Sequence, residues 1–134
     1  CGHADVVKAL GKVKSNIDSG VFQAIQIAGI AALDSEQNLI DNNIKIYQGR
    51  RDCLVSGLRN LGWQLNAPKA TFYAWIKVPN GKDSCKFAKL VLDKTDTIVT
   101  PGVGFGLSGE GYIRIALTVS KERILEALTR FKKL

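Results

Sequence analysis

The residue best suited to chemistry in this sequence is Arg114, which lies in a run of alternating residues over positions 112–117. Alternate side chains of a strand point to opposite faces, so Arg114 is expected on the face that does not enter the core. A guanidinium on a rigid strand can bind a carboxylate through two parallel hydrogen bonds. The alternative is an exposed strand arginine that pairs with an acid on the surface. The residues of this run expected to face the core are Ile113, Ile115 and Leu117.

A glycine-rich loop over residues 101–111 leads directly into this strand. Glycine-rich loops can bind phosphate, but a dinucleotide-binding loop opens a helix, and a P-loop ends in lysine and a hydroxyl residue. Here another strand is expected to follow, and the lysine with its hydroxyl is absent. Positive φ angles and close backbone contacts explain these glycines better than phosphate binding does.

Asn16 is the second candidate, at the junction between two expected helices. An asparagine at a helix end usually caps backbone groups, and that is the interpretation from the residues alone.

Other chemistry-bearing residues form no recognisable set. The three cysteines, Cys1, Cys53 and Cys85, are widely spaced, and His3 is the single histidine. This is too few ligands for a Cys/His metal site, so no metal is predicted and the cysteines are interpreted as reduced thiols. There is no Ser/His/Asp set and no carboxylate pair of known spacing, so no catalytic residue is predicted in this chain.

Composition indicates an ordinary globular domain. Of its 134 residues, 46% are hydrophobic and 23% charged, with a net charge of +7. No apolar stretch approaches the roughly 18 residues of a membrane span, and no signal pattern is visible, so a soluble, cytoplasmic protein is expected. The charge excess lies after residue 50, where fourteen basic residues accompany seven acidic ones. These basic residues are dispersed, which disfavours nucleic-acid binding.

The chain begins Cys-Gly-His and contains no methionine. A natural reading frame needs an initiator, so we expect the chain to be a piece of a longer protein.

Hydrophobic periodicity predicts helices that alternate with clustered strands. This order favours a single domain of the α+β class, a small mixed β-sheet covered by helices, one of them long. The expected helices cover residues 4–14, 21–33, 36–61 and 85–94 and a last segment capped by Ser120; the expected strands cover 63–65, 71–78, 97–100 and 112–118. The helix over 21–33 is apolar over much of its circumference and is expected to be buried.

Four segments of the sequence form a recognisable series: DVVKALGKVKSN with DSG and FQAIQ over 5–26, YQ-x-RRD with LGW over 47–63, PKATFYAW over 68–75, and TPG-x-x-FG with GEGYIRIAL over 100–117. In this order they resemble the small domain of class I/II (fold type I) pyridoxal-phosphate-dependent aminotransferases. The run SNIDSG with FQAIQ and the PKATFY segment look most like LL-diaminopimelate aminotransferases. Gly49 and Ile27 depart from the family pattern.

The resemblance implies that residues 1–134 are the C-terminal small domain of such an enzyme, without its large cofactor-binding domain. The family arginine that grips the substrate α-carboxylate falls on Arg114. The asparagine that lies near both cofactor and substrate falls on Asn16. The family lysine that carries pyridoxal 5'-phosphate lies upstream, so this chain alone is expected to be inactive.

The complete enzyme is then expected to transfer an amino group between an amino acid and a 2-oxo acid, with LL-diaminopimelate and 2-oxoglutarate as the first expectation. An aspartate- or alanine-type enzyme is the alternative within the family. The large domain of the same enzyme and a second subunit of a homodimer are the expected partners, with no nucleic acid and no membrane. A non-catalytic interaction domain and a basic binding module remain the alternatives outside the family.

Overall fold

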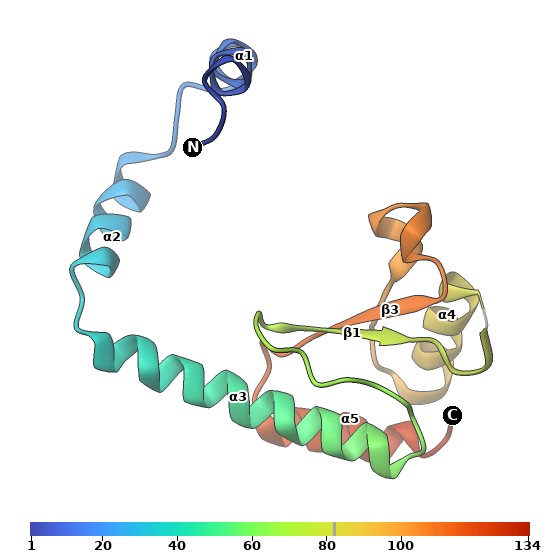
Figure 1. Ribbon diagram of the computed structural model, residues 1–134. Coiled ribbons are helices and arrows are strands. Elements are labelled where there is room, and N and C mark those ends of the chain that lie inside the picture. The colour runs from blue at the N-terminus through green and yellow to red at the C-terminus, as the bar shows by residue number, and fades with distance from the viewer. Residues whose placement is uncertain (82) are drawn as a thin grey trace. The chain divides into compact units, whose positions relative to one another are not determined.

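The computed structural model describes residues 1–81 and 83–134. The chain divides into two units, Cys1–Leu39 and Ile40–Leu134. The elements, in chain order, are helices α1 (Ala4–Lys14), α2 (Gln23–Leu33) and α3 (Gln37–Asn60), strand β1 (Tyr73–Lys77), helix α4 (Ser84–Thr95), strands β2 (Thr100–Pro101) and β3 (Tyr112–Ala116), and helix α5 (Lys121–Phe131) (Figure 1).

The first unit consists of two helices with no buried residue in either. Asp5 lies in the first turn of α1, while Lys12 and Lys14 lie in its last turn, an arrangement that suits the helix dipole. The expectation that residues 21–33 are buried is wrong for this chain, because nothing in the described unit covers the apolar side chains of α2. Ile25, Ile30 and Leu33 are among those that stay exposed.

The second unit is built on a sheet of three described strands in the order β1-β3-β2, which confirms the α+β class. The sheet is antiparallel rather than mixed, because β3 is antiparallel to both neighbours and separates β1 from β2. In this register Arg114 on β3 lies opposite Trp75 on β1 and Thr100 on β2.

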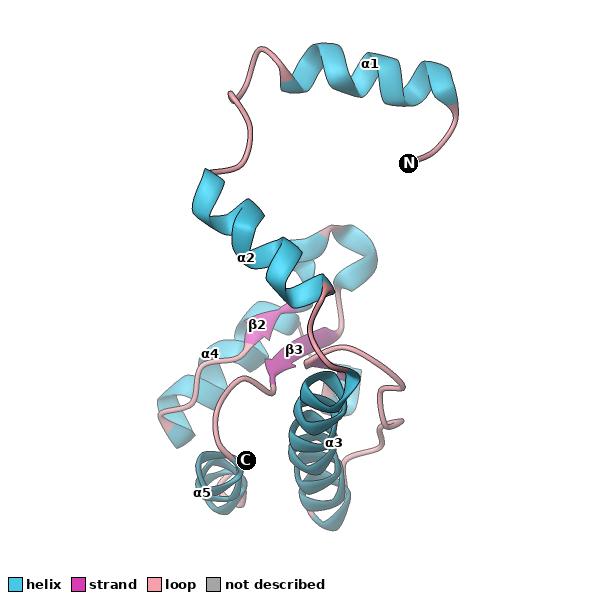
Figure 2. Ribbon diagram, turned by 90° about the vertical axis from the view of Figure 1, so that its left-hand side faces the viewer, coloured by secondary structure: helices cyan, strands magenta, loops and turns pink. Residues whose placement is uncertain are grey.

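The core lies on one face of this sheet, between the strands and the three helices α3, α4 and α5 (Figure 2). Strand residues Ala74, Ile76 and Ile113 point into it, and each is at most 1% exposed. Burial of each large apolar side chain stabilises the fold by roughly 1.5–3 kcal/mol. The helices contribute Leu54, Leu58, Phe87, Val91, Ile124, Leu128 and Phe131 to the same cluster.

Residues 63–65, expected as a strand, join no ladder. The ring of Trp63 instead packs between Phe87, at 5.7 Å, and Phe131, at 6.0 Å between centroids. The backbone carbonyl of Leu65 accepts hydrogen bonds from the guanidinium of Arg59 rather than from a strand. Packing between distant helices therefore overrides the local alternation here.

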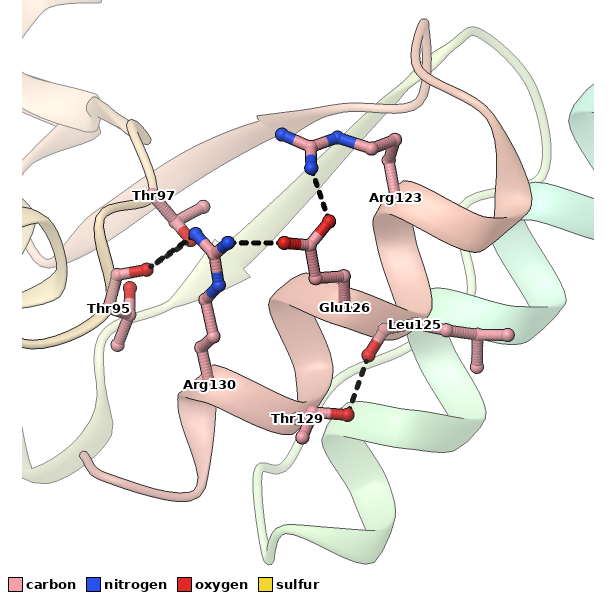
Figure 3. A network of polar contacts seen from close by, with 7 residues as sticks. All are labelled: Thr95, Thr97, Arg123, Leu125, Glu126, Thr129 and Arg130. Atoms are coloured by element: carbon pink, nitrogen blue, oxygen red, sulfur yellow. Dashed lines mark hydrogen bonds and ion pairs between the residues drawn. The ribbon is translucent and has the colours of Figure 1, made fainter.

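Helices α4 and α5 are also joined by a polar network (Figure 3). Glu126 accepts hydrogen bonds from Arg123 and Arg130 on its own helix. Arg130 also donates to the backbone carbonyl of Thr95, at 3.5 Å, at the end of α4. Exposed ion pairs contribute little by themselves, so the apolar core remains the main source of stability.

No helix among the described residues is long and apolar enough to cross a membrane.

Truncation of the core should destabilise this chain far more than truncation of an exposed residue of the same type. Leu58 is 0% exposed and Leu107 is 89% exposed. We predict that Leu58→Ala lowers the free energy of unfolding by about 3 kcal/mol. Leu107→Ala should change it by less than about 0.5 kcal/mol. Urea denaturation of both variants measures these changes, and equal losses would contradict the core described above.

Candidate functional site

Arg114 lies on the open face of the sheet, opposite the core, and is half-buried. Its Cζ atom is 4.1 Å from the ring centroid of Tyr73 and 4.4 Å from that of Phe105. A guanidinium over an aromatic ring gains about 0.5–1 kcal/mol at exposed sites and more when water is excluded. Strand β1 supplies one ring and the glycine loop supplies the other, so two separate segments hold this cation.

In the described part of the chain, no hydrogen bond and no carboxylate holds this guanidinium. Each of the other arginines donates to a carboxylate or a backbone carbonyl: Arg50, Arg51, Arg59, Arg123 and Arg130. The alternative of a strand arginine paired with a surface acid is therefore not observed among the described residues. The N–H donors of Arg114 remain available to a ligand or to water.

Two further rings extend this surface. The ring of Trp75 lies 5.6 Å from Phe105 edge-on and 5.7 Å from Tyr112 in a stacked arrangement. We call the rings of Tyr73, Phe105, Trp75 and Tyr112 the aromatic row. The aromatic row therefore extends the surface beside Arg114 from β1 and the glycine loop to the start of β3.

The glycine loop owes its path to a close backbone contact. A Cβ atom on Gly109 would come within 2.0 Å of the carbonyl oxygen of Gly102, and a Cβ atom on Gly102 would come equally close to that of Gly109. Both glycines are buried. The sequence favours close backbone contacts over phosphate binding as the reason for these glycines, and this geometry agrees with that interpretation.

Glu110 fastens the end of this loop to helix α4. Its carboxylate accepts hydrogen bonds from the backbone N–H of Ser84 at 2.7 Å, from the Ser84 hydroxyl at 3.0 Å and from the backbone N–H of Gly111 at 2.9 Å. The bond from the Ser84 N–H is the main cause that lowers the pKa of Glu110 below its ordinary value of 4.5, followed by that from Gly111. Helix α4 itself is capped by Asp83, whose side chain accepts a hydrogen bond from the backbone N–H of Lys86.

Asn16 lies in the first unit, just beyond the end of α1, and is exposed. Its side-chain Nδ2 donates to the backbone carbonyl of Lys12 at 2.7 Å, and its N–H donates to that of Val13 at 3.1 Å. This is the capping role that its position predicts. A role toward a ligand stays a prediction.

A cleft of about 510 Å³ lies between α3 and the segment 68–72. Tyr47, Arg51 and Phe72 are among the residues that line it, whereas Arg114 is not. The cleft adjoins the aromatic row because the ring of Phe72 lies 4.5 Å from that of Tyr73. No group of three His, Cys, Asp or Glu side chains suited to a metal ion occurs among residues 1–81 and 83–134.

The sequence identified Arg114 but not the residues that surround it. Tyr73 and Phe105 meet the guanidinium only through the pairing of β1 with β3 and the path of the loop. Glu110 and Ser84 are 26 positions apart, so no local pattern joins them. The one available signal was the aromatic alternation of Tyr73 and Trp75, which marks the open face of β1.

Comparison with known proteins shows the family of this chain. Residues 1–131 match the family of class I and II aminotransferases. The chain is 56% identical to the LL-diaminopimelate aminotransferase of Moorella thermoacetica over 133 residues, which cover 99% of the chain and 34% of that relative. It is 54% identical to the enzyme of the same name from Halothermothrix orenii over 131 residues, 98% of the chain and 34% of the relative.

Among solved structures, the L,L-diaminopimelate aminotransferase of Chlamydomonas reinhardtii superposes with a TM-score of 0.81 at 29% identity, over 97% of this chain and 33% of that one. The chain therefore belongs to the class I and II aminotransferase family, which confirms the resemblance found in the sequence. It spans about a third of the length of the curated relatives it matches.

The contact between the two loop glycines gives a direct test of the loop. A Cβ atom at Gly109 must displace backbone, so Gly109→Ala should lower the free energy of unfolding by more than about 2 kcal/mol. Gly104→Ala is the matched control, because a Cβ atom there meets nothing within 4 Å. Chemical denaturation compares the two variants. Equal stabilities would show that the loop does not follow this path.

Because folding lowers the pKa of Glu110, its carboxylate stabilises the fold above the ordinary value of 4.5, and this contribution disappears as the pH falls through the lowered value. The stability difference between the native chain and Glu110→Gln should therefore be constant from about pH 7 to about pH 5 and narrow below that. Denaturation at a series of pH values measures it. A difference that persists unchanged to about pH 2 would contradict the assignment.

Proposed function

We propose that this chain is the C-terminal small domain of an aminotransferase, in which Arg114 binds the α-carboxylate of the substrate. One observation carries the proposal: Arg114 alone among the arginines of the described chain has no polar partner, while two rings hold its guanidinium on the open face of the sheet. A half-buried cation without a partner is costly, and an anionic ligand relieves that cost. Membership of the aminotransferase family supports a carboxylate as that ligand.

Arginine suits this role better than lysine would. Its planar guanidinium can stack on the rings of Tyr73 and Phe105 and still donate two parallel hydrogen bonds from its edge. Two bonds fix the orientation of the carboxylate as well as its position. That orientation decides which bond at the substrate Cα atom is aligned for reaction.

The reaction proposed for the complete protein is amino-group transfer between an amino acid and a 2-oxo acid. LL-Diaminopimelate and 2-oxoglutarate are the proposed pair, because the relatives at 56% and 54% identity are named LL-diaminopimelate aminotransferases. Such a pair gives Arg114 a carboxylate to bind in both half-reactions, since the amino acid and the oxo acid each carry one.

Pyridoxal 5'-phosphate, on which this family generally depends, would supply the electron sink for the reaction when bound. The residues of this chain fit a hydrogen-bond contact at the edge of such a cofactor but not its covalent attachment. Asn16 is exposed, and its hydrogen bond to Lys12 holds a neutral amide at the end of α1. We propose that this amide contacts the cofactor and the substrate by hydrogen bonding, whereas the covalent anchor belongs to another part of the protein.

A large domain and a second subunit are the proposed partners. The apolar side chains of α1 and α2 support this assignment, because large apolar surfaces of soluble proteins are usually covered by another domain or chain. Val6, Val13, Ile25 and Ile30 are among the exposed ones.

The function is tested by substitution of Arg114 in the complete enzyme. Arg114→Ala should lower kcat/KM by at least about 100-fold, and Arg114→Lys by about tenfold, because lysine keeps the charge but loses the paired geometry. Arg123→Ala is the control, since Arg123 is exposed on α5 and pairs with Glu126. Steady-state kinetics with the amino acid and the oxo acid measure these effects. A loss below about tenfold for Arg114→Ala would remove the carboxylate-binding role.

A further inference from the structure

Pro101 belongs to strand β2, so the glycine loop of the structure covers residues 102–111, and both of its ends reach the same residue on helix α4. Near its start, the backbone N–H of Val103 donates to the hydroxyl of Ser84 at 3.5 Å. Near its end, the carboxylate of Glu110 accepts from the backbone N–H of Ser84 at 2.7 Å and from its hydroxyl at 3.0 Å. Ser84 is 0% exposed and begins α4, so it is a fixed point in the unit.

The middle of the loop has little else to attach it to the helices. Leu107 is 89% exposed, and the ring of Phe105, which is 51% exposed, contacts Arg114 and Trp75 on the strands rather than a helix. The remaining hydrogen bonds within the loop, from Gly106 to Val103, from Gly109 to Gly106 and from Glu110 to Leu107, shape its turns but do not attach it to the helices. The attachment of this loop to α4 therefore depends on Ser84 and Glu110.

The start of α4 is suited to bind this carboxylate. The first N–H groups of a helix have no partner within the helix, and its dipole favours negative charge at that end. Among the described residues, two carboxylates accept hydrogen bonds from these donors. Asp83 accepts from the backbone N–H of Lys86, and Glu110 accepts from the backbone N–H of Ser84. Because Glu110 comes from the loop and not from the helix, its bonds tie one element to the other.

The loop in turn carries the ring of Phe105 to the guanidinium of Arg114. We propose that Glu110 is a positioning residue for substrate binding, which fastens the glycine loop to α4 and so keeps Phe105 against Arg114. This inference rests on the proposed function of Arg114. With the loop fastened, the guanidinium is already oriented when the substrate carboxylate arrives. Binding then does not lose the conformational entropy of ordering the Arg114 side chain.

The test uses the complete holoenzyme and the variant Glu110→Gln, which keeps the shape of the side chain but removes its charge. The carboxamide places an NH2 group opposite donors, so at least one hydrogen bond is lost. We expect the KM for the amino-acid substrate to rise about tenfold while kcat changes less than about threefold. The matched control is Glu122→Gln, because Glu122 is also a carboxylate at the start of a helix, α5, and the groups that lower its pKa, first Ser120 and then its own backbone N–H, lie outside the loop.

A second readout does not depend on catalysis. Hydrogen–deuterium exchange of the loop peptide 102–111 should accelerate in Glu110→Gln and stay unchanged in Glu122→Gln. Ser84→Ala removes the hydroxyl that serves both ends of the loop and should act in the same direction. In the double variant, Ser84→Ala with Glu110→Gln, the rise in KM should be less than the product of the two single effects, because both residues belong to one attachment.

The outcomes separate this inference from the function on which it rests. If Arg114→Ala abolishes activity but Glu110→Gln leaves KM unchanged, the positioning role is wrong and the function of Arg114 stands. If Arg114→Ala has no effect, the proposed function fails, while the exchange experiment still decides whether Glu110 holds the loop. A fall in kcat without a rise in KM, or an equal effect of Glu122→Gln, would overturn the positioning role.

Discussion

The site depends on a single cation that the described chain leaves without a charged partner. Arg114 lies between the rings of Tyr73 and Phe105, on the face of the sheet opposite the core. The electron-rich faces of the two rings attract the guanidinium but do not accept hydrogen bonds from its N–H donors. A site of this kind suits a planar anion, and in the proposed function that anion is the carboxylate of the substrate.

The remainder of the second unit explains how this cation is kept in place. Helices α3, α4 and α5 supply their apolar residues to the core on the other face of the sheet, and the open face carries Arg114 and the rings that contact it. The start of α4 also anchors the glycine loop through Ser84 and Glu110. Helix α4 thus packs in the core against the strand that carries Arg114 and also binds the loop that carries Phe105. The same helix therefore serves both the stability of the unit and the geometry of the site.

Sequence patterns predicted the parts of the site that depend on local geometry. The alternation of Ile113 with Arg114 was sufficient to assign the open face, because the side-chain period of a strand is fixed. The rings around Arg114 were not predicted, because their contacts arise from the register of β1 against β3. The strand expected at 63–65 failed for a related reason: Trp63 packs between two helices, and packing over long distances overrides local propensity.

The most direct measurement is a crystal structure of the complete enzyme with its amino-acid substrate or a dicarboxylate inhibitor bound. The account predicts that both oxygens of one carboxylate lie about 3 Å from two nitrogens of Arg114, while Tyr73 and Phe105 keep their contacts with the guanidinium. A structure in which Arg114 pairs with an acidic side chain of another domain, and the ligand carboxylate binds elsewhere, would contradict it.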